Sequence, residues 1–384
     1  MSFYFNRFNC LQLFNGLIFY APVALLVRTQ AGMTVSQFLL LQAVLSIVIF
    51  AGEVPAGMVT DRIGYKNSIV LSQLLLLSAR ACLMVAFLME SLPLFVLEAA
   101  LEGLSNVFYS GTYDAWLYGV YGEEEYLRRS TIANNFGTTG FIASTLLYYV
   151  FYACFGMVGL LVSSTLSSLA AAVCSFGLEK EKSKPEKQEK GSADAFGTLL
   201  KSRELWVMML VSACLTIAML FINFFYVDKL MAVGLDEKLM TPIILGYSVV
   251  ELINARIAKR INSDNQRIFF AASAIILSVG LILFGIVSGV VPVVLLMLVL
   301  PLLVDVPSVI LSKYENDLID KMGAESNRAT VLSVFSMGGS LPEVAMLLVS
   351  SALSGAGTAV CFIALGVAII LLLPIFYLDK LHKK

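Results

Sequence analysis

Long apolar runs follow one another along nearly the whole chain, and each is close to the length that crosses a lipid bilayer. A membrane-spanning helix needs about 20 apolar residues. Of the 384 residues, 59% are hydrophobic and 14% are charged. Soluble proteins are about half apolar and about a quarter charged, so a soluble fold could not bury this much apolar surface. We therefore expect an all-α integral membrane protein of about twelve transmembrane helices joined mostly by short turns.

The expected spans follow directly from the apolar runs. They lie at about 8–27, 36–58, 67–89, 92–114, 131–153, 155–177, 205–227, 240–258, 267–288, 290–312, 328–352 and 356–379. The first run is too long for the apolar core of a secretory signal. Most of the 26 Lys and Arg residues fall in turns on one side of this arrangement. Because positively charged loops stay in the cytoplasm, we expect a multi-pass protein of the cell (plasma or inner) membrane with both termini cytoplasmic.

Composition argues against several classes of function. The net charge of -1 gives no reason to expect a nucleic-acid partner. The single histidine, His382, argues against histidine metal centres, and the six cysteines lie apart in apolar runs, as small buried hydrophobes do. The sequence has no Gly-rich phosphate loop ending in Lys-Ser/Thr, no HExxH and no GxSxG. We expect neither an ATP-driven pump nor an enzyme, with no cofactor and no metal.

The one long polar stretch, 178–204, divides the chain into two similar parts. Its alternating Lys and Glu with Pro and Gly are typical of a flexible linker. We expect six-helix bundles at 1–177 and 205–384. Four residues that follow the fourth span recur at one constant offset after the tenth: Arg129, Thr131, Phe136 and Gly140 fall on Arg328, Thr330, Phe335 and Gly339. Two repeated bundles are a common transporter architecture.

A charged turn, EVPAGMVTDRIGYK at 53–66, separates the second and third spans. Its pattern Gly57-x-x-x-Asp61-Arg62-x-Gly64-x-Lys66 resembles the signature between helices 2 and 3 of the major facilitator superfamily, with Tyr in place of the first basic residue. The runs EVPAG, SGTYDAW and RATVLS look like a bacterial efflux-permease group of that family. The resemblance implies two pseudo-repeated six-helix bundles and secondary active transport by alternating access.

The resemblance also implies a role for the turn. Asp61 would face the N-terminal end of helix 11, near Arg328, where the helix dipole favours an anion. Arg62 would face Asp114, the acid at the cytoplasmic end of helix 4. With Gly57, Gly64 and Lys66 these residues would form a latch that favours the outward-facing state. The alternative is a plain positively charged turn with a capping Asp.

Two features of drug/proton antiporters are absent from the chain. The Arg that precedes a Gly in helix 4 by about four residues is Ala99 here, before Gly103. The helix 5 stretch that resembles Gly-Pro-Gly-Gly reads GTTG at 137–140, without Pro. Both departures argue against assigning the chain to the drug/proton antiporters.

Charged side chains at membrane depth are costly, and each is a candidate functional group. Glu98, Glu102 and Asn106 are four residues apart in the fourth span and therefore share one helical face. At 1.5 Å per residue Glu102 lies about 15 Å from the outer end, and Arg80 in the third span about 13 Å. We expect an intramembrane ion pair between Arg80 and Glu98. Glu102 then remains to take up and release a proton, unless these charges only hold helices together.

Three further acids are second candidates for proton coupling. Glu53 lies eight residues before Asp61 and has the alternative of pairing with a basic loop residue. Asp305 lies between Pro301 and Pro307 in the tenth span, where the prolines predict a broken helix near a site. Glu343 is deep in the eleventh span.

The resemblance implies that spans 1, 4, 7 and 10 line a central cavity. Amides and aromatic side chains in these spans suit an amphipathic organic molecule, or alternatively helix packing. The candidate cavity residues are Gln12, Asn15, Phe19, Tyr20, Asn106, Asn223 and Tyr226. The spans carry no midplane cluster of basic residues, which disfavours polyanionic substrates.

These observations favour proton-coupled export of an amphipathic small molecule or drug by an antiporter. The alternative is proton-coupled uptake of a nutrient such as a sugar or an amino acid. A non-transporting sensor and an intramembrane enzyme are the remaining alternatives. The expected partners are a small-molecule substrate, protons and the lipid bilayer, and we expect a monomer.

Overall fold

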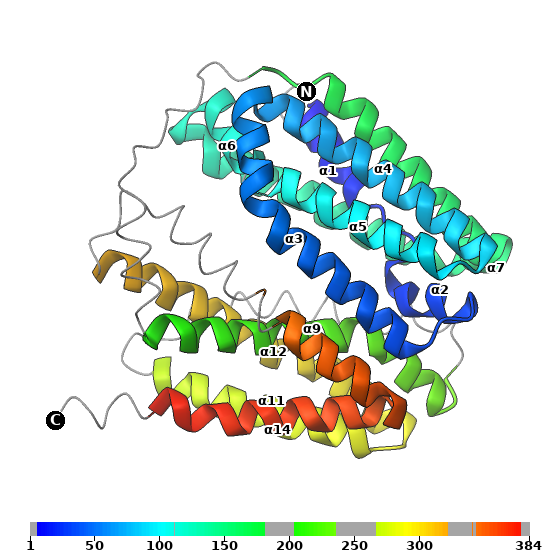
Figure 1. Ribbon diagram of the computed structural model, residues 1–384, viewed down its shortest axis with the longest axis vertical. Helices are drawn as coiled ribbons and strands as arrows, with labels where there is room; N and C mark the ends of the chain where they lie inside the picture. The colour runs from blue at the N-terminus through cyan, green and yellow to red at the C-terminus, as the bar shows by residue number, and fades with distance from the viewer. Residues whose placement is uncertain are drawn as a thin grey trace. The chain divides into compact units, whose positions relative to one another are not determined.

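The computed structural model describes residues 6–110, 112–180, 203–235, 266–321, 340 and 343–377, and every regular element in them is a helix (Figure 1). The chain divides into two compact units, and the division falls in the stretch 181–202, outside the described residues. The predicted span 240–258 and most of the predicted span 328–352 also lie outside them.

The first unit contains a series of long helices with short connections. Its elements are α1 (Arg7–Gly16), the 3-10 turn η1 (Ala21–Val23), α2 (Ala24–Gln30), α3 (Val35–Ile63), α4 (Tyr65–Met89), α5 (Leu92–Tyr109), α6 (Thr112–Tyr121) and α7 (Glu123–Phe176). The described part of the second unit contains α9 (Arg203–Ala232), α11 (Gln266–Ile286), α12 (Val290–Lys321), a helical stretch Glu343–Leu353, η5 (Ser354–Ala356) and α14 (Thr358–Tyr377).

Several of these helices have the length and composition of membrane spans. Among the described residues, five stretches qualify: Arg7–Gln30, Val35–Glu53, Tyr65–Met89, Leu92–Tyr121 and Arg128–Phe176. Shorter apolar helices occur in the second unit. The first unit alone therefore has enough such stretches to cross a bilayer several times.

Local sequence sets where the helices begin and end. The side chain of Asn6 accepts a hydrogen bond from the backbone of Asn9 at the start of α1, as an N-cap does. Gly64 separates α3 from α4 with φ 88°, a conformation that favours glycine. Gly156, with φ 64°, interrupts α7, so the predicted spans 131–153 and 155–177 are two arms of one kinked element.

The first predicted span, 8–27, is not one helix. It stops at Gly16 and resumes at Ala21, and the backbone groups that this break frees are bonded by serines of α7. The Phe19 amide donates to Ser164 Oγ at 3.0 Å, and Ser167 Oγ donates to the Phe14 carbonyl at 2.7 Å. Within a bilayer such backbone must find partners in the protein, and here α7 supplies them.

The tenth predicted span, in contrast to the first, is one continuous helix. The prolines at 301 and 307 predicted a broken helix, but α12 runs through both of them. That prediction was wrong: the described chain has its broken span at 17–20, where a polar α7 replaces the lost helical hydrogen bonds.

Glycines let α1 and α7 approach until their backbones touch. A Cβ added at Gly16 would overlap the Gly137 carbonyl, and one at Gly140 would overlap the Leu13 carbonyl. A Cβ at Gly137 would lie 3.6 Å from the Gln12 carbonyl, an ordinary contact. Close approach through small residues is how helices associate where lipid removes the hydrophobic driving force.

Gly140→Ala is therefore expected to destabilise the first unit by about 1–3 kcal/mol, because the added methyl meets backbone that cannot move aside. Gly137→Ala, in the same helix, is the matched control and should be tolerated. Thermal unfolding of the two purified variants in detergent measures the difference. Equal melting temperatures for the two would contradict the close packing of α1 on α7.

Candidate functional site

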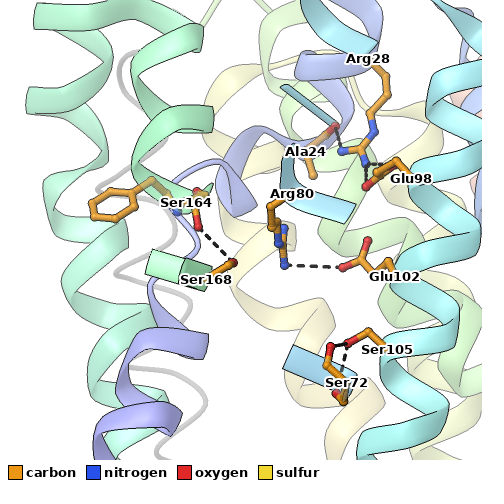
Figure 2. A network of polar contacts seen from close by, with 10 residues as sticks. Ala24, Arg28, Ser72, Arg80, Glu98, Glu102, Ser105, Ser164 and Ser168 are labelled. Atoms are coloured by element: carbon orange, nitrogen blue, oxygen red, sulfur yellow. Dashed lines mark hydrogen bonds and ion pairs between the residues drawn. The ribbon is translucent and has the colours of Figure 1, made fainter. Parts of the chain in front are cut away.

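Two acids of α5 lie one turn apart, and each contacts an arginine from a different helix (Figure 2). Arg28 of α2 donates from Nη2 to both carboxylate oxygens of Glu98, at 2.9 and 3.1 Å, and from Nη1 to the Ala24 carbonyl. The side chains of Arg28 and Glu98 are only 6% and 2% exposed. This first pair is short, multiply bonded and buried.

The second pair is longer and more open. Arg80 of α4 lies with Nη2 3.5 Å from Glu102 Oε1. Arg80 is 8% exposed and Glu102 is 25% exposed, so the acid is the more accessible member of the pair. We refer to Arg28, Glu98, Arg80 and Glu102 together as the charge quartet.

The predicted ion pair between Arg80 and Glu98 is wrong. Arg28 pairs with Glu98 instead, and Arg80 pairs with Glu102. The error arises from treating 8–27 as one straight helix, which ends just before Arg28 and leaves this residue outside the span. The break lets the chain continue helically to Gln30, which carries Arg28 into the interior. Pro22 was the available signal, since proline is favoured in the first turn of a new helix.

Tyr20 stands at the end of the break and faces both arginines. Its ring centroid is 4.9 Å from the guanidinium carbon of Arg80 and 6.0 Å from that of Arg28. Tyr20 is 4% exposed. Such cation–π contacts contribute about 0.5–2 kcal/mol, more when desolvated. The predicted cavity residue Tyr20 therefore packs, in this structure, against the bases of the charge quartet, and Phe19 is buried next to it.

Breaking the buried pair has a measurable consequence. Arg28→Met leaves Glu98 buried without its counter-ion, which costs about 3–5 kcal/mol. Replacing both partners, Arg28→Met with Glu98→Met, should recover most of that loss, because no charge is then left unpaired. Thermal unfolding of the single and double variants in detergent tests this. A double variant no more stable than the single one would contradict the assignment of Arg28 to Glu98.

Polar contacts continue along α4 and α5 beyond the charge quartet. Ser105 Oγ donates to the Ser72 carbonyl at 2.9 Å, and the two hydroxyls lie 3.3 Å apart (Figure 2). Both serines are buried, whereas the predicted cavity residue Asn106 is exposed. The interface of α4 and α5 therefore contains buried polar side chains, and the neighbouring Asn106 is exposed.

A second polar group lies where α1 meets the end of α5. Gln12 Nε2 donates to Tyr109 Oη at 2.6 Å, and Asn15 also contacts this hydroxyl. The Asn15 Oδ1 atom is buried and has no hydrogen-bond partner. The Tyr113 hydroxyl continues the group toward α7, where it donates to Asn134 Oδ1 at 3.2 Å. The predicted cavity residues Gln12 and Asn15 thus belong to an uncharged set of amides and phenols.

The predicted charged turn at 53–66 is helical in the structure except at Gly64, because α3 continues to Ile63 and α4 begins at Tyr65. Asp61, Arg62 and Gly57 are exposed, and Lys66 is half-buried. In the part of the chain that the structure describes, no ion pair joins Arg62 to Asp114; Asp114 Oδ1 instead accepts a hydrogen bond from Tyr126 Oη at 2.8 Å. Burial and this bond raise the pKa of Tyr126 to about 12, which keeps the phenol protonated as the donor.

The remaining candidates are spread over both units. Arg328, the expected neighbour of Asp61, lies outside the described residues. Glu53 of α3 is half-buried. In the second unit Asp305 and Glu343 are half-buried, Asn223 is exposed and Tyr226 is buried. Within the first unit, the ion pairs of the charge quartet do not include Glu53.

Comparison with known proteins decides the family. A model of the Major Facilitator Superfamily matches residues 8–341. The chain belongs to the major facilitator superfamily. Among solved structures, the nucleoside transporter NupG is similar, with a TM-score of 0.76, 14% identity, and coverage of 97% of this chain and 98% of that chain. The comparison with curated proteins gives no match.

The family match and the fold confirm the main predictions from sequence. The protein is an all-α, multi-pass membrane transporter with the major facilitator fold, and not an enzyme. At 14% identity the likeness to NupG shows the fold alone. The likeness to NupG therefore gives no role to the charge quartet, and any role is argued from the distances and burial of these four residues.

Proposed function

We propose that this member of the superfamily is a proton-coupled secondary transporter that exports an amphipathic small molecule in exchange for protons. The observation that carries the proposal is the difference between the two ion pairs on α5. A coupling group must be reachable from water and must be able to lose its partner, and Glu102 meets both conditions better than Glu98.

Charge balance in the quartet supports exchange at Glu102. Two arginines and two glutamates sum to zero when all four are ionised. A proton on Glu102 raises this sum by one unit, and a monovalent organic cation that binds the carboxylate raises it by the same amount. Because both neutralise the same group, they compete for it. Competition of this kind makes the proton and the substrate alternate, which is the requirement for antiport.

The charged turn serves a different role in this proposal. Asp61 and Arg62 contribute to a latch that stabilises one state of the alternating-access cycle, together with Gly57, Gly64 and Lys66. Gly64 supports this role, because its positive φ fixes the direction in which α4 leaves α3. Both charged side chains are exposed in this structure and are therefore available for a contact made in another state.

A second candidate is proton-coupled uptake of a small polar nutrient. The similarity to a nucleoside transporter in fold favours it, and so does the uncharged set of amides and phenols around Tyr109. Uncharged donors and acceptors suit hydroxyl and amide groups of a neutral solute. Direction of transport separates the two candidates in vesicles of defined orientation.

Glu102→Gln is expected to reduce flux driven by a pH gradient to the level of protein-free proteoliposomes, because the amide cannot bind and release a proton. The control is Glu90→Gln, which removes an exposed acid at the turn between α4 and α5. Fluxes of a panel of fluorescent amphipathic compounds, with and without an imposed gradient, measure the effect. Full gradient-driven flux in Glu102→Gln would refute the coupling role.

Asp61→Asn is expected to slow transport several-fold by shifting the balance between the two access states. A single cysteine in place of Met58, an exposed side chain one turn before Asp61, reports the shift through its rate of reaction with a maleimide. The conservative Asp61→Glu should react as the parent does. If Asp61→Asn leaves both transport and labelling unchanged, the turn is not a latch.

A further inference from the structure

We propose that the guanidinium of Arg80 occupies a binding site for an organic cation, between the Tyr20 ring and the Glu102 carboxylate, and that the substrate's cationic group displaces it. The ligand class is a monovalent organic cation with a planar guanidinium or amidinium group. This inference rests on the proposed function, because it names the substrate class for the Glu102 site.

The contrast between the two arginines supports displacement of Arg80 and not of Arg28. Arg28 bonds both oxygens of Glu98 and also the Ala24 carbonyl, and its ring contacts with Tyr20 and Phe38 are distant, at 6.0 and 5.9 Å. Arg80 makes one long ion pair, and among the described residues this is its only polar contact. Its closest contact of another kind is with the Tyr20 ring, at 4.9 Å. Arg28 is therefore held by three hydrogen bonds, whereas Arg80 is held by one long ion pair and one ring contact.

The two groups that hold Arg80 are those that recognise cations in general. An aromatic face attracts a cation through its quadrupole, and a carboxylate beside it adds a directional charge. Arg80 fills both positions with a planar cation of its own. A substrate with the same chemistry would find the same two partners once Arg80 moves away, and the bound state would keep the ring and the acid satisfied.

An anionic substrate fits the same geometry less well. It would have to reach Arg80, which is only 8% exposed, while the 25% exposed Glu102 would repel it. The other charged groups nearby do not change this conclusion, because Glu98 is neutralised by Arg28. The accessible member of the pair is the acid, so the approaching ligand is a cation.

Arg80 then competes with the ligand for the site, so its removal should increase the affinity for the ligand. Apparent affinity is reduced by the fraction of time the site is filled, so Arg80→Met should bind phenylguanidinium at least about tenfold more tightly than the parent. Glu102→Gln should lose this binding. Tyr20→Phe should keep it, since the ring remains, and Tyr20→Leu should weaken it.

Isothermal titration of purified protein in detergent with phenylguanidinium and with benzoate measures these affinities without a pH gradient. Ser78→Ala, an exposed α4 position two residues before Arg80, is the control and should bind as the parent does. Size-exclusion chromatography confirms folding. If Arg80→Met does not fold, Arg80→Lys replaces it, because a compact ammonium contacts ring and carboxylate less well and should also tighten binding.

Weaker phenylguanidinium binding in Arg80→Met, or undiminished binding in Glu102→Gln, would overturn the proposal. Benzoate binding that depends on Arg80 would assign the site to anions instead. Because no gradient is used, cation binding with no proton-driven flux would refute the coupling while leaving the cation site intact. Gradient-driven flux with no cation binding would refute the cation site while leaving the coupling intact.

Discussion

Neutralising charge inside an apolar interior is the constraint on which the rest of the first unit depends. Two carboxylates on α5 would each be costly alone at membrane depth. Two arginines offset them, one from α4 and one from α2. The second of these reaches its acid only because the first span breaks at 17–20 and resumes as a new helix. The break in turn requires serines on α7 to bond the freed backbone.

The two Arg–Glu ion pairs on α5 therefore differ in their burial and in their hydrogen bonding. Arg28 and Glu98 are buried and held by several hydrogen bonds, so their pair stabilises the packing of α2 on α5. Arg80 and Glu102 are separated by 3.5 Å and share their surroundings with an aromatic ring. Ion-pair networks also occur for structural reasons, so an ion pair does not identify a functional site by itself. From the difference in exposure between the two pairs we propose that the Arg28–Glu98 pair serves packing and that Glu102 of the other pair serves transport.

Much of this was predictable from the sequence. Apolar length identified the membrane helices, the pattern at 57–66 identified the superfamily, and four-residue spacing placed Glu98 and Glu102 on one face. Gly64 ends α3, as a glycine in a charged turn suggested.

The pairing of the acids was not predictable in the same way, because it depends on where a helix breaks. The periodicity of apolar residues does not indicate the break at 17–20, because the residues on both sides of it are apolar. Proline was an ambiguous signal: Pro22 starts a new helix, whereas α12 continues through Pro301 and Pro307. The deciding factor is whether a neighbour can bond the freed backbone, and that neighbour, α7, lies more than 100 residues away in the sequence.

In the proposed mechanism a proton and an organic cation alternate at Glu102. Proteoliposomes that carry a trapped pH indicator and no initial pH gradient test it most directly, when a membrane-impermeant guanidinium compound is added outside. If the two ions exchange at Glu102, protons leave the vesicles as the cation enters, and Glu102→Gln abolishes this proton movement. Cation entry without proton movement, or with protons moving in the same direction, would contradict it.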